Sequence, residues 1–249
     1  PYDLVGEYKD LWMNAQKTDK TEHIFALQHS LSYLPSQYGI SYLGKEENGW
    51  YDYVGDPVFF KNFPDDKRKK FCYVTSTVDT QGNQIEWEDF DIGAPFIRKY
   101  RNYGGCGTYG IEGNTATRSS LSEGLTPIYR FADVLLIYAE ASNKAEGSPN
   151  TLAYKCLNRV RDRAFGDQSH QYAGLTPEKF ADAVFDEFGW ENVFEFKRWF
   201  QLVRTEKVDE AVGKNTAIGA RLNANKENYL FPIPVRQCEL RGWKNNPGY

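Results

Sequence analysis

Methionine, cysteine and histidine are scarce in this sequence, and a long apolar run is missing. The 249 residues include one Met, four Cys and three His. A helix that crosses a bilayer needs about 20 consecutive apolar residues, and no segment has them, so we expect no transmembrane helix. No charged segment followed by an apolar one opens the chain, so we expect no signal peptide in it. The chain starts at Pro1 and its one Met is Met13, which predicts a processed chain or a piece of a longer protein.

The cysteines and histidines are too dispersed to indicate a metal site or a catalytic site. No Cys-x-x-Cys and no paired Cys and His spacing occurs, so we expect no zinc site, and calcium binding stays open from the sequence. A Gly-x-Ser-x-Gly motif and a glycine-rich phosphate loop are also missing, so we expect neither a nucleophilic enzyme nor a nucleotide cofactor. The cysteines allow two disulfides in any of three connectivities, or none: Cys72, Cys106, Cys156 and Cys238. Cys156 falls on the apolar face of an expected helix, which favours a buried free thiol.

Positive charge is neither in excess nor clustered. The chain has 30 Lys and Arg against 34 Asp and Glu, for a formal net charge of −4. Binding to nucleic acid needs grouped Lys and Arg, so we expect no nucleic-acid partner. The basic run 67–70 directly follows Asp65 and Asp66, and we interpret it as a solvent-exposed turn.

Aromatic residues are abundant, at 16% of the chain. The remaining composition, with 41% hydrophobic and 26% charged residues, is that of an ordinary globular protein. A chain of this length can bury a core without metal ions or disulfides. We expect part of the aromatic content to pack helices and the rest to lie in loops.

The first half of the chain divides into a helical segment and a loop-rich one. Leu4, Tyr8 and Leu11 recur at helical spacing, so we expect residues 1–30 to be helical and to pack on helices that precede this chain; within them, 23–28 fits a helix or a buried strand. Residues 31–127 are rich in Gly, Pro, Asn, Asp and Tyr. There we expect a strand over 71–78, a returning strand over 84–87 and an extended piece over 95–100.

Residues 128–249 are expected to be mainly helical. Apolar periodicity predicts one helix from about 128 to Glu146 and a second that starts with Ser148 as cap and Pro149 as first residue. A third starts at Thr176 and Pro177 and reaches about 204, with a kink or a break at Gly189. The first two form a hairpin like a tetratricopeptide unit. We expect 205–228 to be loop. Residues 229–234, followed by 245–249, are expected to be extended, because Pro232 and Pro234 forbid a helix.

Four ordered segments resemble signatures of the SusD/RagB family of outer-membrane nutrient-binding lipoproteins. They are residues 130–141 (RFADVLLIYAEA), 157–164 (LNRVRDRA), 195–204 (EFKRWFQLVR), and the end, 229–234 (YLFPIP) with 246–249 (NPGY). Residues 186–195 depart from the family, which usually has a Glu-Arg pair there. The resemblance covers most of the chain, as the C-terminal part of a longer member.

The resemblance implies a mainly α fold, with tetratricopeptide-like helices packed on a loop-rich part that contains small β-hairpins. It implies a surface-exposed protein of the cell outer membrane, held there only by a lipid on an N-terminal Cys that this chain does not contain. Such a protein captures an oligosaccharide or polysaccharide and delivers it to a TonB-dependent transporter of the SusC type. It binds without catalysis. Some family members take peptides instead.

Ligand contacts are expected in two loop clusters that interleave aromatic and polar residues. Aromatic rings offer flat apolar faces to the C–H groups of a sugar, and neighbouring polar groups bind its hydroxyls. The first cluster is Tyr42, Trp50, Tyr51 and Tyr53, and the second is Arg101, Asn102, Tyr103 and Tyr109. No position transfers from the family, because its sugar-binding aromatics lie in variable loops.

Two further functions remain open from the sequence. Carboxylates at Glu86, Glu88, Asp89 and Asp91 fit a paired-carboxylate glycoside hydrolase, although an exposed acidic turn explains them more simply. The helical hairpin would also fit a scaffold for protein partners.

Overall fold

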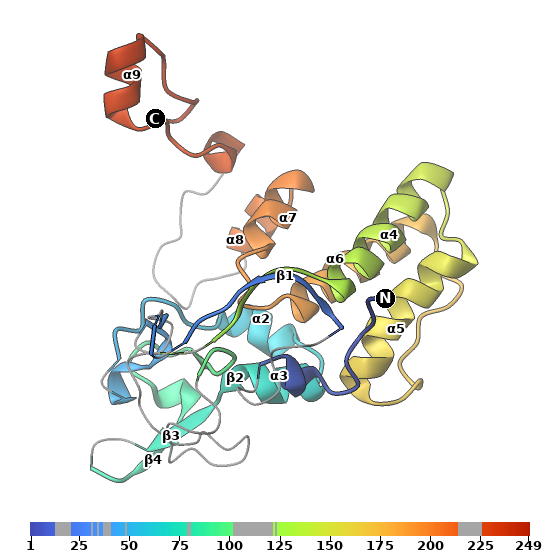
Figure 1. Cartoon of the computed structure of the whole chain (residues 1–249), viewed down its shortest axis with the longest axis horizontal. Coiled ribbons are helices and arrows are strands. Elements are labelled where there is room, and N and C mark those ends of the chain that lie inside the picture. The colour runs from blue at the N-terminus through green and yellow to red at the C-terminus, as the bar shows by residue number, and fades with distance from the viewer. Residues whose placement is uncertain are drawn as a thin grey trace.

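A computed structural model places residues 1–12, 21–30, 32–33, 35–36, 41–47, 49–78, 81–101, 122, 124–213 and 226–249. Figure 1 shows long helices packed together, a loop-rich part with short helices and strands, and a C-terminal segment that extends away from both. Within those ranges, no helix combines the length and the apolarity that crossing a bilayer requires.

The long helices are α4 (Phe131–Glu146), α5 (Thr151–Phe165) and α6 (Pro177–Glu191). Each turns an apolar face to the others, and the residues buried between them include Ala132, Leu136, Ala139, Leu157, Val160, Phe180 and Val184. The predicted hairpin and third helix are confirmed. The first helix starts later than predicted, because residues up to Arg130 form a strand, β6 (Thr126–Arg130).

Two predicted details of these helices are wrong. The cap of α5 is Asn150, whose side chain accepts a hydrogen bond from the Ala153 N–H at 2.8 Å, so the helix starts after Ser148 and Pro149. Helix α6 continues through Gly189 without a break. A Cβ at Gly189 would lie 2.7 Å from the guanidinium of Arg198, so the glycine makes room for that side chain. The helix ends instead at a turn, residues 192–197, before α7 (Arg198–Arg204).

The N-terminal segment is not a helix in its described part. One 3₁₀ turn, η1 (Tyr8–Leu11), buries Tyr8 and Leu11, and the chain then forms β1 (His23–Leu27). Strand β1 pairs antiparallel with β6, with Phe25 opposite Tyr129. The helical spacing of the apolar residues therefore reflects one buried turn, and pairing with a distant strand decides the rest.

The loop-rich part contains short elements around an aromatic core. They are η2 (Lys45–Glu47), α2 (Pro57–Asn62), α3 (Lys67–Cys72), β2 (Tyr73–Val74), β3 (Ser76–Val78), β4 (Gln84–Glu86), η3 (Trp87–Asp89) and β5 (Phe96–Ile97). Strands β3 and β4 form the predicted hairpin, and β2 pairs with β5. Residues 71 and 72, predicted as strand, belong to α3.

The basic run 67–70 is helical rather than an exposed turn. The carboxylate of Asp66 caps α3, accepting hydrogen bonds from the N–H groups of Arg68 and Lys69 at 2.8 and 3.0 Å. The Arg68 side chain is fully buried among carboxylates. The sequence alone does not reveal that these carboxylates surround Arg68, because two of them, Glu187 and Glu191, lie on α6.

The C-terminal region contains more helix than predicted. Helix α8 (Val208–Gly213) lies within the predicted loop, and the 3₁₀ turn η4 (Lys226–Tyr229) overlaps its end. Helix α9 (Val235–Arg241) starts directly after Pro234, where a proline needs no N–H partner and interrupts nothing. Helix α9 buries none of its residues and lies apart from α4–α6 in Figure 1.

The described cysteines are free thiols. Cys72 and Cys156 are buried, which confirms the expectation for Cys156, and Cys238 is half-buried. Burial raises the pKa of the Cys72 thiol to about 11. Cys106 lies outside the described residues.

Candidate ligand-binding surface and its buried support

The first aromatic cluster lies on a loop that folds back on itself. We call residues 41–47 and 49–53 the aromatic loop. The N–H of Tyr51 donates to the Leu43 carbonyl at 3.0 Å, and the N–H of Tyr53 donates to the Ser41 carbonyl at 3.3 Å. At Gly49 a Cβ would lie 2.1 Å from the Leu43 carbonyl oxygen, so only glycine permits this approach. The backbone therefore holds the loop in one defined shape.

Three of the predicted contact residues face solvent on this loop. Trp50 is 53% exposed, Tyr53 51% and Tyr51 36%. Tyr51 has a φ of 41°, a left-handed conformation that a tyrosine rarely adopts. Strained backbone in a well-packed surrounding is common at functional sites. The loop thus presents aromatic side chains at fixed positions on the surface.

Tyr42 and Arg101 lie in the interior instead. The Tyr42 ring is buried and packs edge-on against Tyr53, with ring centroids 5.6 Å apart. Arg101 donates to both carboxylate oxygens of Glu47, at 2.8 and 2.7 Å, in a buried bidentate pair. Glu47 belongs to the aromatic loop, so these residues support the exposed side chains from below. Asn102, Tyr103 and Tyr109 lie outside the described residues.

Phe196 joins this surface from a distant part of the chain. It lies in the 192–197 turn, is 49% exposed and has a φ of 60°. Its ring packs edge-on against Tyr53, with centroids 5.9 Å apart and planes at 84°. The predicted third helix reaches about residue 204 and so includes Phe196 as one of its apolar residues, and no local signal distinguishes it from its neighbours there.

A shallow depression beside the aromatic loop has mixed charge. It is lined by Lys45, Glu46, Tyr51, Asp91, Ile92 and Phe96. The ammonium of Lys45 pairs with Asp91 at 3.1 Å, and both are exposed. Of the carboxylates considered for glycoside hydrolysis, Glu86, Glu88 and Asp89 are likewise exposed on β4 and η3.

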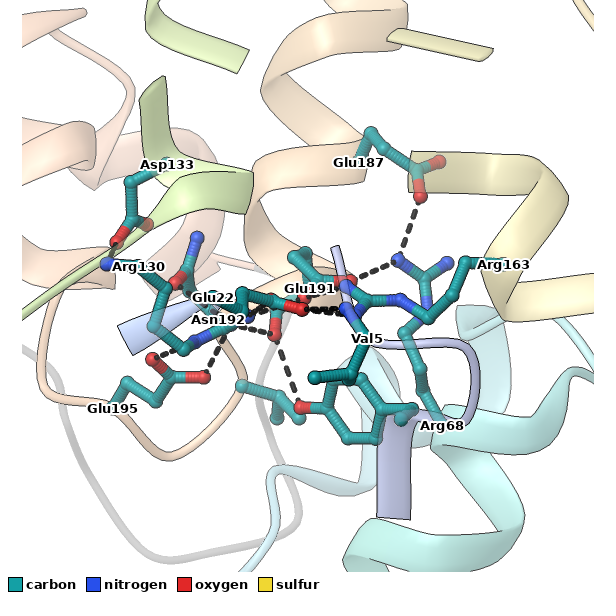
Figure 2. A network of polar contacts seen from close by, with 12 residues as sticks. Val5, Glu22, Arg68, Arg130, Asp133, Arg163, Glu187, Glu191, Asn192 and Glu195 are labelled. Atoms are coloured by element: carbon teal, nitrogen blue, oxygen red, sulfur yellow. Dashed lines mark hydrogen bonds and ion pairs between the residues drawn. The ribbon is translucent and has the colours of Figure 1, made fainter. Parts of the chain in front are cut away.

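A buried ionic network includes side chains of the 192–197 turn, and Figure 2 shows its central part. Its cations are Arg68, Lys99, Arg130, Arg161, Arg163 and Lys197, and its carboxylates are Glu22, Asp66, Asp133, Glu187, Glu191 and Glu195. Formal charge within this set is balanced, which offsets the large desolvation penalty of burying ions.

Arg130 is the centre of the network. Its guanidinium reaches Glu22 at 2.6 Å, Glu191 at 2.7 Å and Glu195 at 2.7 Å. These carboxylates come from the segment before β1, from α6 and from the 192–197 turn. A single side chain on β6 therefore connects the segment before β1 with the end of α6 and the turn that follows it, both far from Arg130 in sequence.

Electrostatics keep the network ionised. Burial alone would raise the pKa of Glu191, but the three guanidinium groups beside it lower that pKa to about 2. The pKa of Glu195 is also lowered, because Arg130, Lys99 and Lys197 together outweigh its burial. These carboxylates already bind cations and serve the fold. In the part of the chain that the structure describes, no group of His, Cys, Asp and Glu side chains is arranged to hold a metal ion.

Comparison with known proteins agrees with this fold. The SusD family model matches residues 43–249. SusD-like protein P2 of Formosa agariphila is 26% identical over 275 residues, which cover 99% of this chain and 52% of that protein. A SusD superfamily protein of Parabacteroides distasonis, solved by crystallography, is 24% identical with a TM-score of 0.74, covering 100% of this chain and 54% of its own.

A third similar protein was solved with a sugar. Surface glycan-binding protein A of Bacteroides thetaiotaomicron, in complex with laminarihexaose, is 19% identical with a TM-score of 0.68, covering 99% of this chain and 56% of its own. The chain spans about half the length of each of these relatives. The predicted mainly α, tetratricopeptide-like fold is confirmed. With a family match over most of its length, the chain belongs to the SusD family.

Proposed function

We propose that this chain is part of a non-catalytic glycan-binding receptor on the cell surface. The observation that carries the proposal is the aromatic loop, which presents Trp50, Tyr51 and Tyr53 to solvent on a backbone of defined shape. A sugar ring has C–H groups on its faces and hydroxyls at its rim, so exposed aromatic side chains with polar neighbours suit it. A related protein of the same fold was solved with laminarihexaose, which supports this ligand class.

Polar groups around the aromatic loop are suited to binding the hydroxyls of a sugar. Asp52 lies between two of the aromatic residues, and Lys45 and Asp91 border the depression beside Tyr51. Such groups donate to and accept from hydroxyls without any bond chemistry. Binding would follow from surface complementarity alone, and the protein would release its ligand unchanged.

Family membership supports a further step, delivery to a transporter. We propose that the full-length protein, lipid-anchored at the outer membrane, passes captured oligosaccharide or polysaccharide to a SusC-like, TonB-dependent transporter. The aromatic loop would face the ligand before transfer. Co-purification of the full-length protein with such a transporter from membranes tests this step, and separate elution at low salt would contradict it.

Binding is tested with a panel of soluble oligosaccharides. The panel contains laminarihexaose, a cello-oligosaccharide, a xylo-oligosaccharide and an oligogalacturonide, and each is titrated by calorimetry while the mixture is analysed for released sugar. We expect at least one ligand to bind and none to be cleaved. Trp50→Ala should weaken binding about tenfold, because it removes the most exposed ring of the loop.

The outcomes separate the proposal from its alternatives. Released sugar would show that the protein is a glycoside hydrolase and not a non-catalytic receptor. If the protein binds none of the oligosaccharides but binds members of a peptide library, its ligand is a peptide and not a glycan. Capture of protein partners without any small ligand would favour a scaffold.

A further inference from the structure

The 192–197 turn holds an unusual backbone. Two of its non-glycine residues have left-handed φ values, 65° at Phe194 and 60° at Phe196. L-amino acids avoid this region, because the Cβ approaches the following carbonyl oxygen. Such a conformation persists only where surrounding contacts determine it. The contacts of the turn should therefore explain why Phe194 and Phe196 keep these backbone conformations.

Buried side chains bind the turn along its length. The Lys99 ammonium donates to the Val193 carbonyl at 2.8 Å and to the Glu195 carboxylate at 2.6 Å. The Tyr100 hydroxyl donates to the Phe194 carbonyl at 2.9 Å. Glu195 also accepts two hydrogen bonds from Arg130, at 2.7 and 3.0 Å. Hydrogen bonds from the buried ionic network thus hold the backbone of the turn in place directly before Phe196.

The rings of the two strained residues contact different partners. The Phe194 ring packs against Tyr73 in the aromatic core, with centroids 4.9 Å apart. The Phe196 ring remains half-exposed beside Tyr53. The core contact accounts for Phe194, whereas Phe196 combines its ring contact to Tyr53 with 49% exposure to solvent.

A continuous set of ring contacts connects this position to the interior. Phe196 contacts Tyr53, Tyr53 contacts Tyr42, and Tyr42 contacts Tyr100 at 5.5 Å. Tyr100 then contacts the buried Trp12 at 5.6 Å. The exposed rings are consequently fixed before any ligand arrives, which reduces the entropy lost on binding.

We propose that Phe196 contacts the same sugar as Tyr53, as part of the ligand-binding surface, and that Glu195 is a positioning residue for it. This inference rests on the proposed glycan-binding function. The planes of Phe196 and Tyr53 stand at 84°, so they form a corner with two apolar faces. One face suits the C–H groups of a pyranose ring and the other suits the edge of the same sugar or of its neighbour. Phe196 has no hydroxyl, so its contribution is apolar contact.

The test compares two exposed phenylalanines that lie four residues apart in the sequence. Phe196→Ala and the control Phe200→Ala are titrated with the panel oligosaccharide that the unchanged protein binds most tightly. Phe200 lies on α7 and is 66% exposed, more than Phe196. We expect binding to weaken about tenfold in Phe196→Ala and to stay within twofold in Phe200→Ala.

The role of Glu195 is tested by a double-mutant cycle. Glu195→Gln keeps the shape of the side chain and removes its charge, and circular dichroism at the assay temperature identifies the folded variants. A positioning residue acts through Phe196, so Glu195→Gln should weaken binding in the unchanged protein and add nothing in the Phe196→Ala background. A merely structural role would weaken binding equally in both backgrounds.

Failure of this inference differs from failure of the proposed function. If Trp50→Ala weakens binding and Phe196→Ala does not, the receptor stands and Phe196 is not part of its site. If the unchanged protein binds none of the oligosaccharides, both proposals fall. If Phe196→Ala and Phe200→Ala weaken binding equally, the effect is not specific to the corner and the inference is wrong.

Discussion

At the residue scale, the dominant feature is charge that is buried and paired. Replacing a buried pair by apolar groups can be harmless, but removing one partner leaves an uncompensated ion in the interior. Exposed pairs behave differently, because water screens them. The chain offers both kinds on one helix, α5, where Arg163 is buried and Arg159 pairs with Asp3 at the surface.

We predict that Arg163→Ala lowers the free energy of unfolding by about 3–5 kcal/mol, because Glu22 and Glu191 each lose a partner at 2.7 Å. Arg159→Ala should lower it by less than about 1 kcal/mol. Urea unfolding of both variants measures the two values. Equal losses would mean that the network does not contribute more than a surface pair.

His23 predicts a pH dependence of stability. Burial lowers the pKa of His23 to about 4, and the charge of Arg130 adds to the effect. The unfolded chain, with the ordinary value of 6.5, takes up this proton first as the pH falls. The contribution of neutral His23 to the free energy of unfolding is therefore fully present above about pH 6.5 and is lost as the pH falls toward 4. Melting temperatures over this range should show the decrease, and His23→Gln should flatten it; an unchanged slope would refute the assignment.

At the element scale, the aromatic loop depends on close backbone approach. Gly49 lies against Leu43, and Gly44 lies against Phe96, whose ring a Cβ at Gly44 would overlap. The buried pair of Glu47 with Arg101 then connects the loop to the end of β5. These interior contacts, rather than contacts among the exposed aromatics, determine where Trp50 and Tyr51 lie.

We predict that Gly49→Ala destabilises the protein by about 1–3 kcal/mol, because the added methyl meets backbone that must shift. It should also weaken glycan binding by displacing Trp50. Gly6→Ala is the matched control, since a Cβ there meets nothing within 4 Å, and we expect no change in binding. Chemical denaturation and oligosaccharide titration give both quantities. Full binding by Gly49→Ala would show that the loop tolerates rearrangement.

At the scale of the whole molecule, the network and the aromatic core join most of the chain. The network connects the segment before β1, α3, α5, α6 and the 192–197 turn, so these parts should unfold together. The C-terminal segment, residues 226–249, differs. Helix α9 buries none of its residues, and the pair of Lys226 with Glu206 is exposed on both sides.

We predict that removal of residues 226–249 changes the melting temperature of this chain by less than about 2 °C, because an exposed seven-residue helix adds little stability. In hydrogen exchange, amides of α9 should exchange far faster than those of α6, which is packed on two helices. Protection of α9 equal to that of α6 would show that the segment folds with the rest.

The sequence alone predicted the family, the helices α4–α6 and an exposed aromatic loop. Helical periodicity, the Thr176–Pro177 start and the four family segments are local patterns, and local patterns can be read without a structure. Trp50, Tyr51 and Tyr53 were predicted as surface residues from their Gly and Asp neighbours, and they are exposed. Whether they bind a glycan stays a prediction.

Only the tertiary structure decided which charges are buried and which rings meet. Arg68 looks like part of an exposed basic run, and Tyr42 and Arg101 look like members of binding clusters, yet distant partners bury all three. Phe196 looks like a helix core residue. Lys99 and Arg130, however, form hydrogen bonds with Glu195 directly before it, and its ring lies at the surface beside Tyr53. The physical reason is the same in each case: salt bridges and ring contacts join residues far apart in the chain, where sequence patterns carry no information.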